Sequence, residues 1–238
     1  MKRVILIFTL ILVFTSNLRS DDFKLNQEVS GLKSPWSLTF IKQNEILISE
    51  KSGQILFVNL NEKKIKKINH NLKILEDGQG GLLEILYNKN IVFVSYSENR
   101  GNGKSSTSVA SAIFNYENLN FKNIFRAEPP INSGYHFGSR LVIKDDFLFI
   151  TVGERGKGMI AQNPSKHPGS IIRIHLDGSI PKDNPKFKGK DNWLPEIYQI
   201  GVRNPQGMDV SPYDNKIYLT NHGAKGGDWF GEAKYGEN

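Results

Sequence analysis

Eight polar residues of this chain lie directly before or after short apolar runs and beside glycines. Histidine can accept a proton near neutral pH, a fixed guanidinium can stabilise developing negative charge, and glycine lets the backbone approach a ligand closely. The set consists of Gln79 in EDGQGGLL, His136 in GYHFGSRL, Glu154 and Arg155 in TVGERG, Arg203 and Asn204 in GVRNPQG, and His222 and Asp228 in NHGAKGGD. If the fold brought these side chains close together, they could transfer protons and stabilise charge on a small ligand.

Each of these residues also has a purely structural interpretation. His136, between Tyr135 and Phe137, could be a hydrogen-bonded structural histidine. Glu154 and Arg155 could form a surface ion pair, which contributes little to stability. The other loops could be ordinary turns or inter-strand pairs, although main-chain carbonyls in HGAKGGD could also ligate a hard cation.

Four segments that would position these residues share one pattern, at residues 37–53, 82–101, 139–156 and 207–226. Each has a short apolar strand, a polar Asn- or Asp-containing turn, a second strand rich in Ile, Val, Phe or Tyr, and a glycine at its end. Such units are β-hairpins, and hairpins that recur every several tens of residues favour sheets arranged radially in a β-propeller. A generic β-sandwich is the alternative.

The propeller interpretation explains the polar residues. The inner strand of each sheet runs along a central channel, so residues at the same point of each unit become neighbours at one face. Pro205 would then stiffen the corner that directs Arg203 and Asn204 toward the mouth of this channel. The sequence therefore predicts an all-β fold, a β-propeller, with one shared site.

The N-terminus predicts export. Lys2 and Arg3 precede an apolar run that ends at Phe14 and is shorter than the ~20 residues a membrane-spanning helix needs. Residues 1–20 are expected to be a signal peptide and residues 21–238 the propeller domain, secreted or periplasmic, without stable membrane insertion after cleavage.

Composition narrows the partners and the stabilising forces. Removing three leader cations from the net charge of +7 leaves +4, a modest surplus for which no nucleic-acid partner is expected. Cysteine is absent, so stability depends on packing and on any bound metal or cofactor. The sequence has no GxSxG, HExxH or P-loop motif, which leaves serine-hydrolase, zinc-protease and nucleotide-binding interpretations without support.

Together the segments resemble the soluble, quinone-dependent glucose/sorbosone dehydrogenase family, and within it the periplasmic aldose sugar dehydrogenases. The resemblance covers nearly all of the predicted mature chain. It rests on PWSLTF, EILISEKSGQI, GQGGLLEI, HFGSRLVI, LFITVGERG, GSIIRIHLDGSIPKDNP, PEIYQIGVRNPQGM and NHGAKGGD. It implies a six-bladed β-propeller that holds pyrroloquinoline quinone (PQQ) and calcium, and oxidation of the anomeric CH–OH of an aldose to a lactone by hydride transfer to PQQ.

The resemblance also implies roles for particular residues. His136 is similar to the general base of the family, and Gln79 and Glu154 fall where the family contacts the sugar substrate. Arg203, Asn204, His222 and Asp228 fall where the family contacts PQQ. The carbonyls of Gly223 and Ala224 are similar to the loop that holds the calcium. The acceptor that removes electrons from the quinone stays unidentified.

The chain departs from the family in several places. Tyr135 stands where some members have an acid, Glu154 replaces an aspartate of the glucose-specific members, and Trp229 stands where many have a glutamate. The chain ends at Asn238 within a segment that continues in relatives, so we expect a truncated propeller of about four blades.

Two further interpretations of the sequence stay open. One is a non-catalytic propeller module that binds carbohydrate or protein. The other is a calcium-dependent sugar-lactone hydrolase, which would need a carboxylate cluster, whereas only Glu154 and Asp228 stand at the relevant positions.

Overall fold

The computed structural model describes residues 24–186 and 192–238. The predicted signal peptide lies outside the described residues. The chain divides into a first unit, Met1–Ser30, whose described residues contain no strand or helix, and a second unit, Gly31–Asn238, which holds every described strand. In the ranges that the structure describes, no helix is long and apolar enough to span a bilayer.

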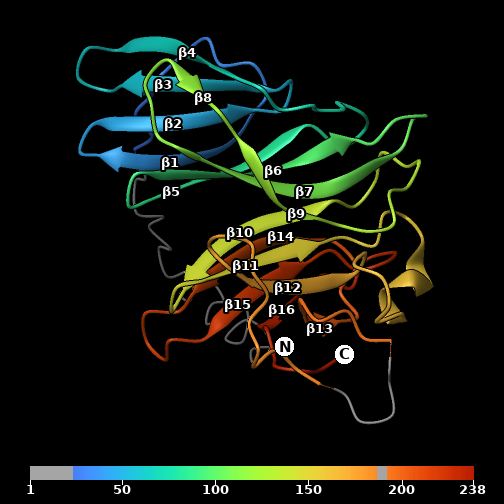
Figure 1. Ribbon diagram of the computed structural model, residues 1–238. Helices are drawn as coiled ribbons and strands as arrows, with labels where there is room; N and C mark the ends of the chain where they lie inside the picture. Colours follow the sequence, from blue (N-terminus) through green and yellow to red (C-terminus); the bar gives the residue numbers. More distant parts are fainter. Residues whose placement is uncertain (1–23, 187–191) are drawn as a thin grey trace, which may run out of the picture. The chain divides into compact units, whose positions relative to one another are not determined.

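The second unit consists of four antiparallel sheets, with one short parallel addition (Figure 1). The first sheet is β1 (Pro35–Lys42), β2 (Glu45–Glu50), β3 (Gln54–Asn59) and β4 (Lys64–His70), to which β8 (Asn118–Leu119) adds in parallel. The second is β5 (Leu82–Asn88), β6 (Ile91–Asn99), β7 (Ser105–Ile113) and β9 (Lys122–Arg126). The third is β10 (Gly138–Lys144), β11 (Phe147–Val152), β12 (Ser170–His175) and β13 (Ile197–Ile200). The fourth is β14 (Pro205–Val210), β15 (Ile217–Asn221) and β16 (Trp229–Glu232), and a 3₁₀ turn η1 (Gly158–Gln162) follows β11.

The predicted hairpins form the first two strands of every sheet. Tight turns join β5 to β6 through Lys89 and Asn90, and β10 to β11 through Asp145 and Asp146, all four with positive φ. Two consecutive positive φ angles match the right-handed twist of the flanking strands. The turn residues therefore fix the register of these hairpins.

Three apolar layers separate the four sheets. Strand β6 shows how they arise, because Val92 and Val94 belong to the layer shared with the first sheet while Phe93 belongs to the layer shared with the third. Side chains alternate across a strand, so the continuous apolar run at residues 91–94 can pack on both faces. A third layer, which includes Phe149 and Leu219, joins the third and fourth sheets.

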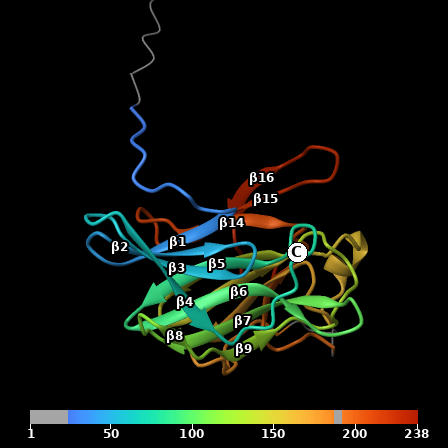
Figure 2. The same ribbon diagram turned by 90° about the horizontal axis from the view of Figure 1, so that it is seen from above.

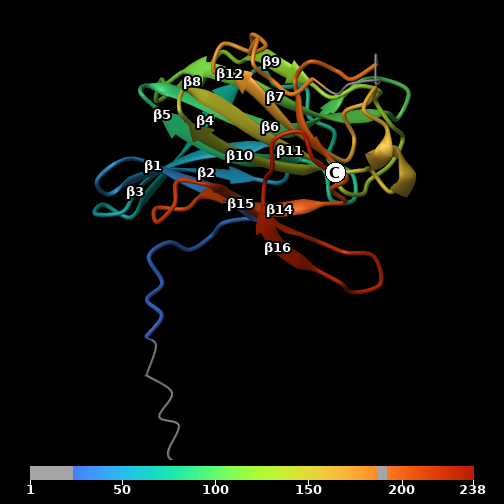
Figure 3. The same cartoon turned by 90° about the horizontal axis from the view of Figure 1, so that it is seen from below.

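The first strands of the sheets lie next to one another. Strand β1 contacts β5 (Figure 2), β5 contacts β10, and β10 contacts β14. Seen from the opposite side, β14 and β15 lie beside β10 and β11 (Figure 3), and β14 contacts β11 as well as β10. Four sheets packed face to face in chain order confirm the predicted propeller fold and argue against a two-sheet sandwich.

This arrangement gathers the predicted site residues at one face. Gln79, His136 and Asn204 come just before the inner strands β5, β10 and β14, while Glu154 and His222 come just after the second strands β11 and β15. Since each second strand is antiparallel to its inner strand, the start of one and the end of the other share one end of the sheet.

Candidate functional site

His136, Glu154 and Arg203 form the centre of the site. Nδ1 of His136 lies 2.7 Å from Oε1 of Glu154, and Nε of Arg203 lies 3.8 Å from the same oxygen. The side chains of His136 and Glu154 are 14% and 5% exposed, whereas that of Arg203 is 33% exposed. A nearly buried carboxylate therefore connects an imidazole and a guanidinium that reach the surface.

The contacts of Glu154 determine which nitrogen of His136 carries a proton. Oε2 of Glu154 accepts hydrogen bonds from the backbone N–H groups of Lys157 and Gly158. Because an ionised carboxylate only accepts hydrogen bonds, Nδ1 of His136 donates to Oε1, and in the neutral imidazole Nε2 then keeps its lone pair. The imidazole is thus arranged to accept a proton at Nε2.

The backbone of His136 adopts an uncommon conformation that its neighbours stabilise. Its φ is +50°, in the left-handed region that non-glycine residues rarely occupy. The His136 N–H donates to Oε1 of Gln79 at 2.8 Å, and the His136 carbonyl accepts from the Arg155 N–H at 3.2 Å. At Gly153 a Cβ would lie 2.1 Å from the His136 carbonyl, so only glycine fits beside this segment.

Arg155 holds the segment that carries His136. Its guanidinium is fully buried and donates to the carbonyls of Ser105, Ser133 and Tyr135, and it lies 3.7 Å above the ring of Phe137. Burial lowers its pKa to about 10, against the attraction of nearby carboxylates. It therefore stays charged near neutral pH and ties residues 133–137 to the start of β7.

Asn221 shapes the corner that carries Arg203 and Asn204. Its Oδ1 accepts from the N–H groups of Arg203 at 3.0 Å and Asn204 at 2.8 Å. Asn204 is itself buried, and its Oδ1 accepts from the Gly138 N–H at 3.1 Å. The corner attributed to Pro205 therefore depends on the last residue of β15, whose role the sequence pattern did not reveal.

The loop after β15 brings two more predicted residues to the site. Nη1 of Arg203 donates to the His222 carbonyl at 3.2 Å. Nδ1 of His222 lies 3.1 Å from Oδ2 of Asp228, whose Oδ1 accepts from the Gly223 N–H at 2.9 Å. The hydrogen bond from Gly223 lowers the pKa of Asp228, and His222 acts in the same direction. Asp228 therefore closes the loop on which Gly223 and Ala224 lie.

The predicted calcium ligands can be compared with the donors in this loop. Across the two described ranges, no cluster of three or more His, Cys, Asp or Glu side chains is arranged to hold a metal. Within them the carbonyl oxygens of Gly223 and Ala224 accept no hydrogen bond. Carbonyl oxygens suit calcium, which takes six to eight oxygen ligands, so these two could supply only part of its shell.

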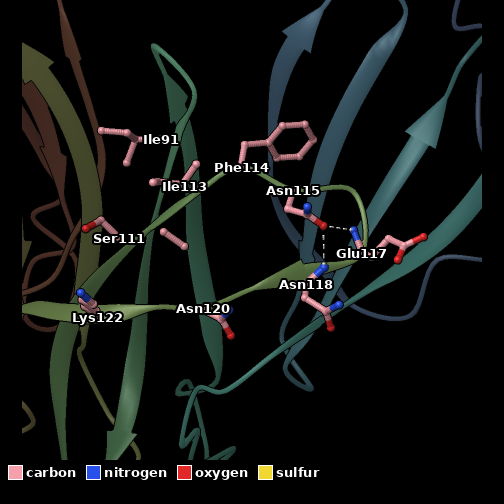
Figure 4. Close-up of a pocket in the computed structure, with 10 residues that line it drawn as sticks. Ile91, Ser111, Ile113, Phe114, Asn115, Glu117, Asn118, Asn120 and Lys122 are labelled. Carbon is pink, nitrogen blue, oxygen red and sulfur yellow. Dashed lines mark hydrogen bonds between the residues drawn. The ribbon is translucent and has the colours of Figure 1, made fainter.

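One pocket lies away from this site. A pocket of about 600 Å³ lies between the end of β7 and the segment leading to β9, with Ile91, Ile113 and Phe114 on its apolar side (Figure 4). Ile91 starts β6, whereas the candidate site lies near the other end of that strand. A pocket of about 380 Å³ beside the site is lined by His222, Asp228 and Trp229, among others. The chemistry of the side chains, and not the pocket volume, therefore locates the candidate site.

The structure thus brings most of the predicted residues into one network. Gln79, His136, Glu154, Arg203, Asn204, His222 and Asp228 are linked to one another directly or through one backbone group, and Gly223 joins through its N–H. Ala224 is exposed and joins only along the chain. Their roles toward ligands stay predictions.

Comparison with known proteins places this β-propeller in a family. The family model of glucose/sorbosone dehydrogenases matches residues 32–238. The chain belongs to this glucose/sorbosone dehydrogenase family.

Similar proteins span the described fold and extend beyond it. The chain is 32% identical to aldose sugar dehydrogenase YliI of Escherichia coli strain K12 over 217 residues, which cover 87% of this chain and 58% of that protein. It is 29% identical to quinoprotein glucose dehydrogenase B of Acinetobacter calcoaceticus, with 88% and 50% covered. A crystal structure of a glucose dehydrogenase superposes with a TM-score of 0.84 at 33% identity, covering 90% of this chain and 64% of that one. The chain therefore spans about half to three fifths of the length of these two curated relatives.

Proposed function

We propose that this chain carries the sugar- and quinone-binding residues of a PQQ-dependent aldose sugar dehydrogenase. In the proposed reaction the anomeric carbon of the sugar loses a hydride to PQQ, its hydroxyl loses a proton to His136, and a lactone carbonyl forms. Family membership and the names of the aldose and quinoprotein relatives support this proposal. The observation that carries it is the 2.7 Å contact between His136 and Glu154, which leaves Nε2 as a proton acceptor.

His136 and Glu154 share the proton transfer. Nε2 of His136 accepts the hydroxyl proton, and the carboxylate of Glu154 stabilises the imidazolium that results. General-base catalysis of this kind typically contributes ~10²–10⁴-fold to the rate. Because both carboxylate oxygens of Glu154 already accept hydrogen bonds within the chain, we propose that it orients the base in addition to any sugar contact. Gln79 would contribute to the sugar site through its amide nitrogen, since its Oε1 is engaged by His136.

Arg203 and its neighbours would hold the cofactor. When bound, PQQ supplies an electrophilic carbonyl carbon as hydride acceptor, and calcium polarises that carbonyl as a Lewis acid. The part-exposed guanidinium of Arg203 suits the anionic charge that develops on a quinone oxygen. Asn204 follows Arg203 in the chain, and its carbonyl accepts from the N–H of His222. Asp228 would act indirectly, because its carboxylate contacts His222 and Gly223. The carbonyls of Gly223 and Ala224 would donate to calcium.

The direct test is turnover. The purified chain, supplied with PQQ and calcium, should reduce a redox dye when an aldose is added, and a chelator should abolish the signal. Failure to turn over any member of an aldose panel, under conditions where the E. coli relative is active, would refute the proposal. Sugar binding without quinone uptake would instead support a non-catalytic propeller module.

The location of the reaction follows from the predicted leader. If residues 1–20 direct export, oxidation would take place in the periplasm or outside the cell, with an electron acceptor still to be identified. Recovery of the mature chain from a periplasmic extract, with Asp21 as its first residue, would support this proposal.

A further inference from the structure

We propose that Gln206 is a positioning residue that fixes the amide of Asn204, so that the Asn204 NH₂ group is the one free to meet the cofactor. This inference rests on the proposed function for the identity of the ligand. The orientation itself depends only on contacts within the chain.

Gln206 and Asn204 meet over the backbone of Gly138. Nε2 of Gln206 donates to Oδ1 of Asn204 at 3.0 Å and to the carbonyl of Gly138 at 3.4 Å. The Gly138 N–H donates to the same Asn204 oxygen at 3.1 Å. Gly138 at the start of β10 and the side chains of Asn204 and Gln206 at the start of β14 are thus joined by three mutual hydrogen bonds.

Backbone groups decide which end of each amide is which. Side-chain amide orientations must be inferred from their hydrogen-bond partners. A backbone N–H can only donate, so the Asn204 atom that faces the Gly138 N–H must be oxygen. A carbonyl can only accept, so the Gln206 atom that faces the Gly138 carbonyl must be nitrogen. Both assignments are therefore fixed by Gly138.

This orientation leaves the NH₂ group of Asn204, with its two N–H donors, unused within the described residues. Its Oδ1 receives two hydrogen bonds, while its Nδ2 makes none within the described residues. The only buried side-chain polar atom without a partner in those residues is Nε1 of Trp36, so Nδ2 of Asn204 keeps contact with solvent although the residue is 3% exposed. A quinone carbonyl or carboxylate oxygen is the kind of ligand atom that such a donor would bind.

Without Gln206 the Asn204 amide would keep only the hydrogen bond from Gly138 and would turn more readily. A methionine at this position removes the second donor and leaves Asn204 held by Gly138 alone. A glutamate removes the donor and adds oxygens that repel Oδ1, so Asn204 is expected to turn its NH₂ group toward the new carboxylate. The turned amide would present nitrogen to the Gly138 N–H and oxygen to the cofactor, and both contacts would be lost.

Hydrogen exchange of the Gly138 amide tests the orientation in the chain without any ligand. Gln206→Glu should accelerate its exchange by about tenfold or more, because the amide loses its acceptor. The matched control is Gln43→Glu, which adds the same charge at an exposed turn between β1 and β2 and should leave Gly138 unchanged. Unchanged Gly138 exchange in Gln206→Glu would overturn the proposal. If that variant does not fold, Gln206→Met should raise the exchange rate a few-fold, and no change there would overturn the proposal equally.

Titration with PQQ then tests the consequence for the cofactor. We expect Gln206→Met to weaken PQQ binding by about five- to tenfold, and Gln206→Glu by more, with Gln43→Glu close to wild type. Equal PQQ affinity in all four proteins would refute the role of Gln206 in cofactor binding. Absence of PQQ binding by the wild-type chain would refute the proposed function, whereas the Gly138 measurement would still decide the orientation.

Discussion

Replacing Arg155 by methionine gives the sharpest test of how the site is held together. Methionine fills a similar volume but cannot donate, so the carbonyls of Ser105, Ser133 and Tyr135 would each lose the hydrogen bond from the guanidinium. Each hydrogen bond from a charged donor contributes ~1.5–3 kcal/mol, while exposure of two of the carbonyls to water and relief from burying a guanidinium offset part of the sum. We therefore expect the free energy of unfolding to fall by about 3 kcal/mol.

Urea unfolding monitored by tryptophan fluorescence measures this change. With a slope of about 2–3 kcal/mol per molar urea, the midpoint should fall by roughly 1 M or more. Lys157→Met is the matched control, because it removes an exposed cation two residues away and should change the stability by less than about 0.5 kcal/mol. A loss below about 1 kcal/mol for Arg155→Met would show that Arg155 does not hold residues 133–137.

Substitutions at three other residues test separate parts of the account. His136→Ala should lower sugar-dependent dye reduction by ~10²–10⁴-fold while PQQ uptake persists, and activity close to wild type would exclude His136 as the base. Asn221→Leu should destabilise the chain by about 2 kcal/mol in urea and weaken PQQ binding, because two backbone N–H groups lose their acceptor; Asn221→Asp keeps an acceptor and should recover most of both. Burial lowers the pKa of His70, whose Nδ1 accepts from the Leu72 N–H and whose Nε2 lies 2.6 Å from the Gly53 carbonyl. The unfolded chain therefore binds a proton at this histidine more readily than the folded chain does, so the free energy of unfolding should decrease as the pH is lowered below ~6.5. His70→Gln should make this decrease smaller, and a pH profile of stability identical to that of the wild type would contradict the expectation.

The repeated hairpins could be predicted from sequence because their signals are local. Asn and Asp turns between alternating or continuous apolar runs determine strand pairing within a sheet, and the turns at Asn90 and Asp146 have the backbone conformation that this pattern requires. The shared face followed from the same periodicity, since equivalent points in successive units lie at one end of the sheets.

The contacts that hold the site could not be predicted, because they join residues far apart in the chain. Arg155 was noted as one of the polar residues at the shared face or as a surface partner of Glu154, yet it is fully buried and bonds to Ser105, 50 residues away. Asn221 and Gln206 stood inside noted motifs without any role assigned to them. Residue type and spacing do not indicate burial or distant partners, so only the packed structure reveals which polar residues position others.

The protonation state of His136 tests the central claim most directly, because the proposed chemistry requires Nε2 to accept a proton. Nitrogen-15 NMR of the imidazole, assigned with His136→Gln, distinguishes a protonated from an unprotonated ring nitrogen. In the neutral imidazole we predict a proton on Nδ1, hydrogen-bonded to Glu154, and none on Nε2, with this preference lost in Glu154→Gln. A proton on Nε2 and none on Nδ1 in the wild-type chain would contradict the account.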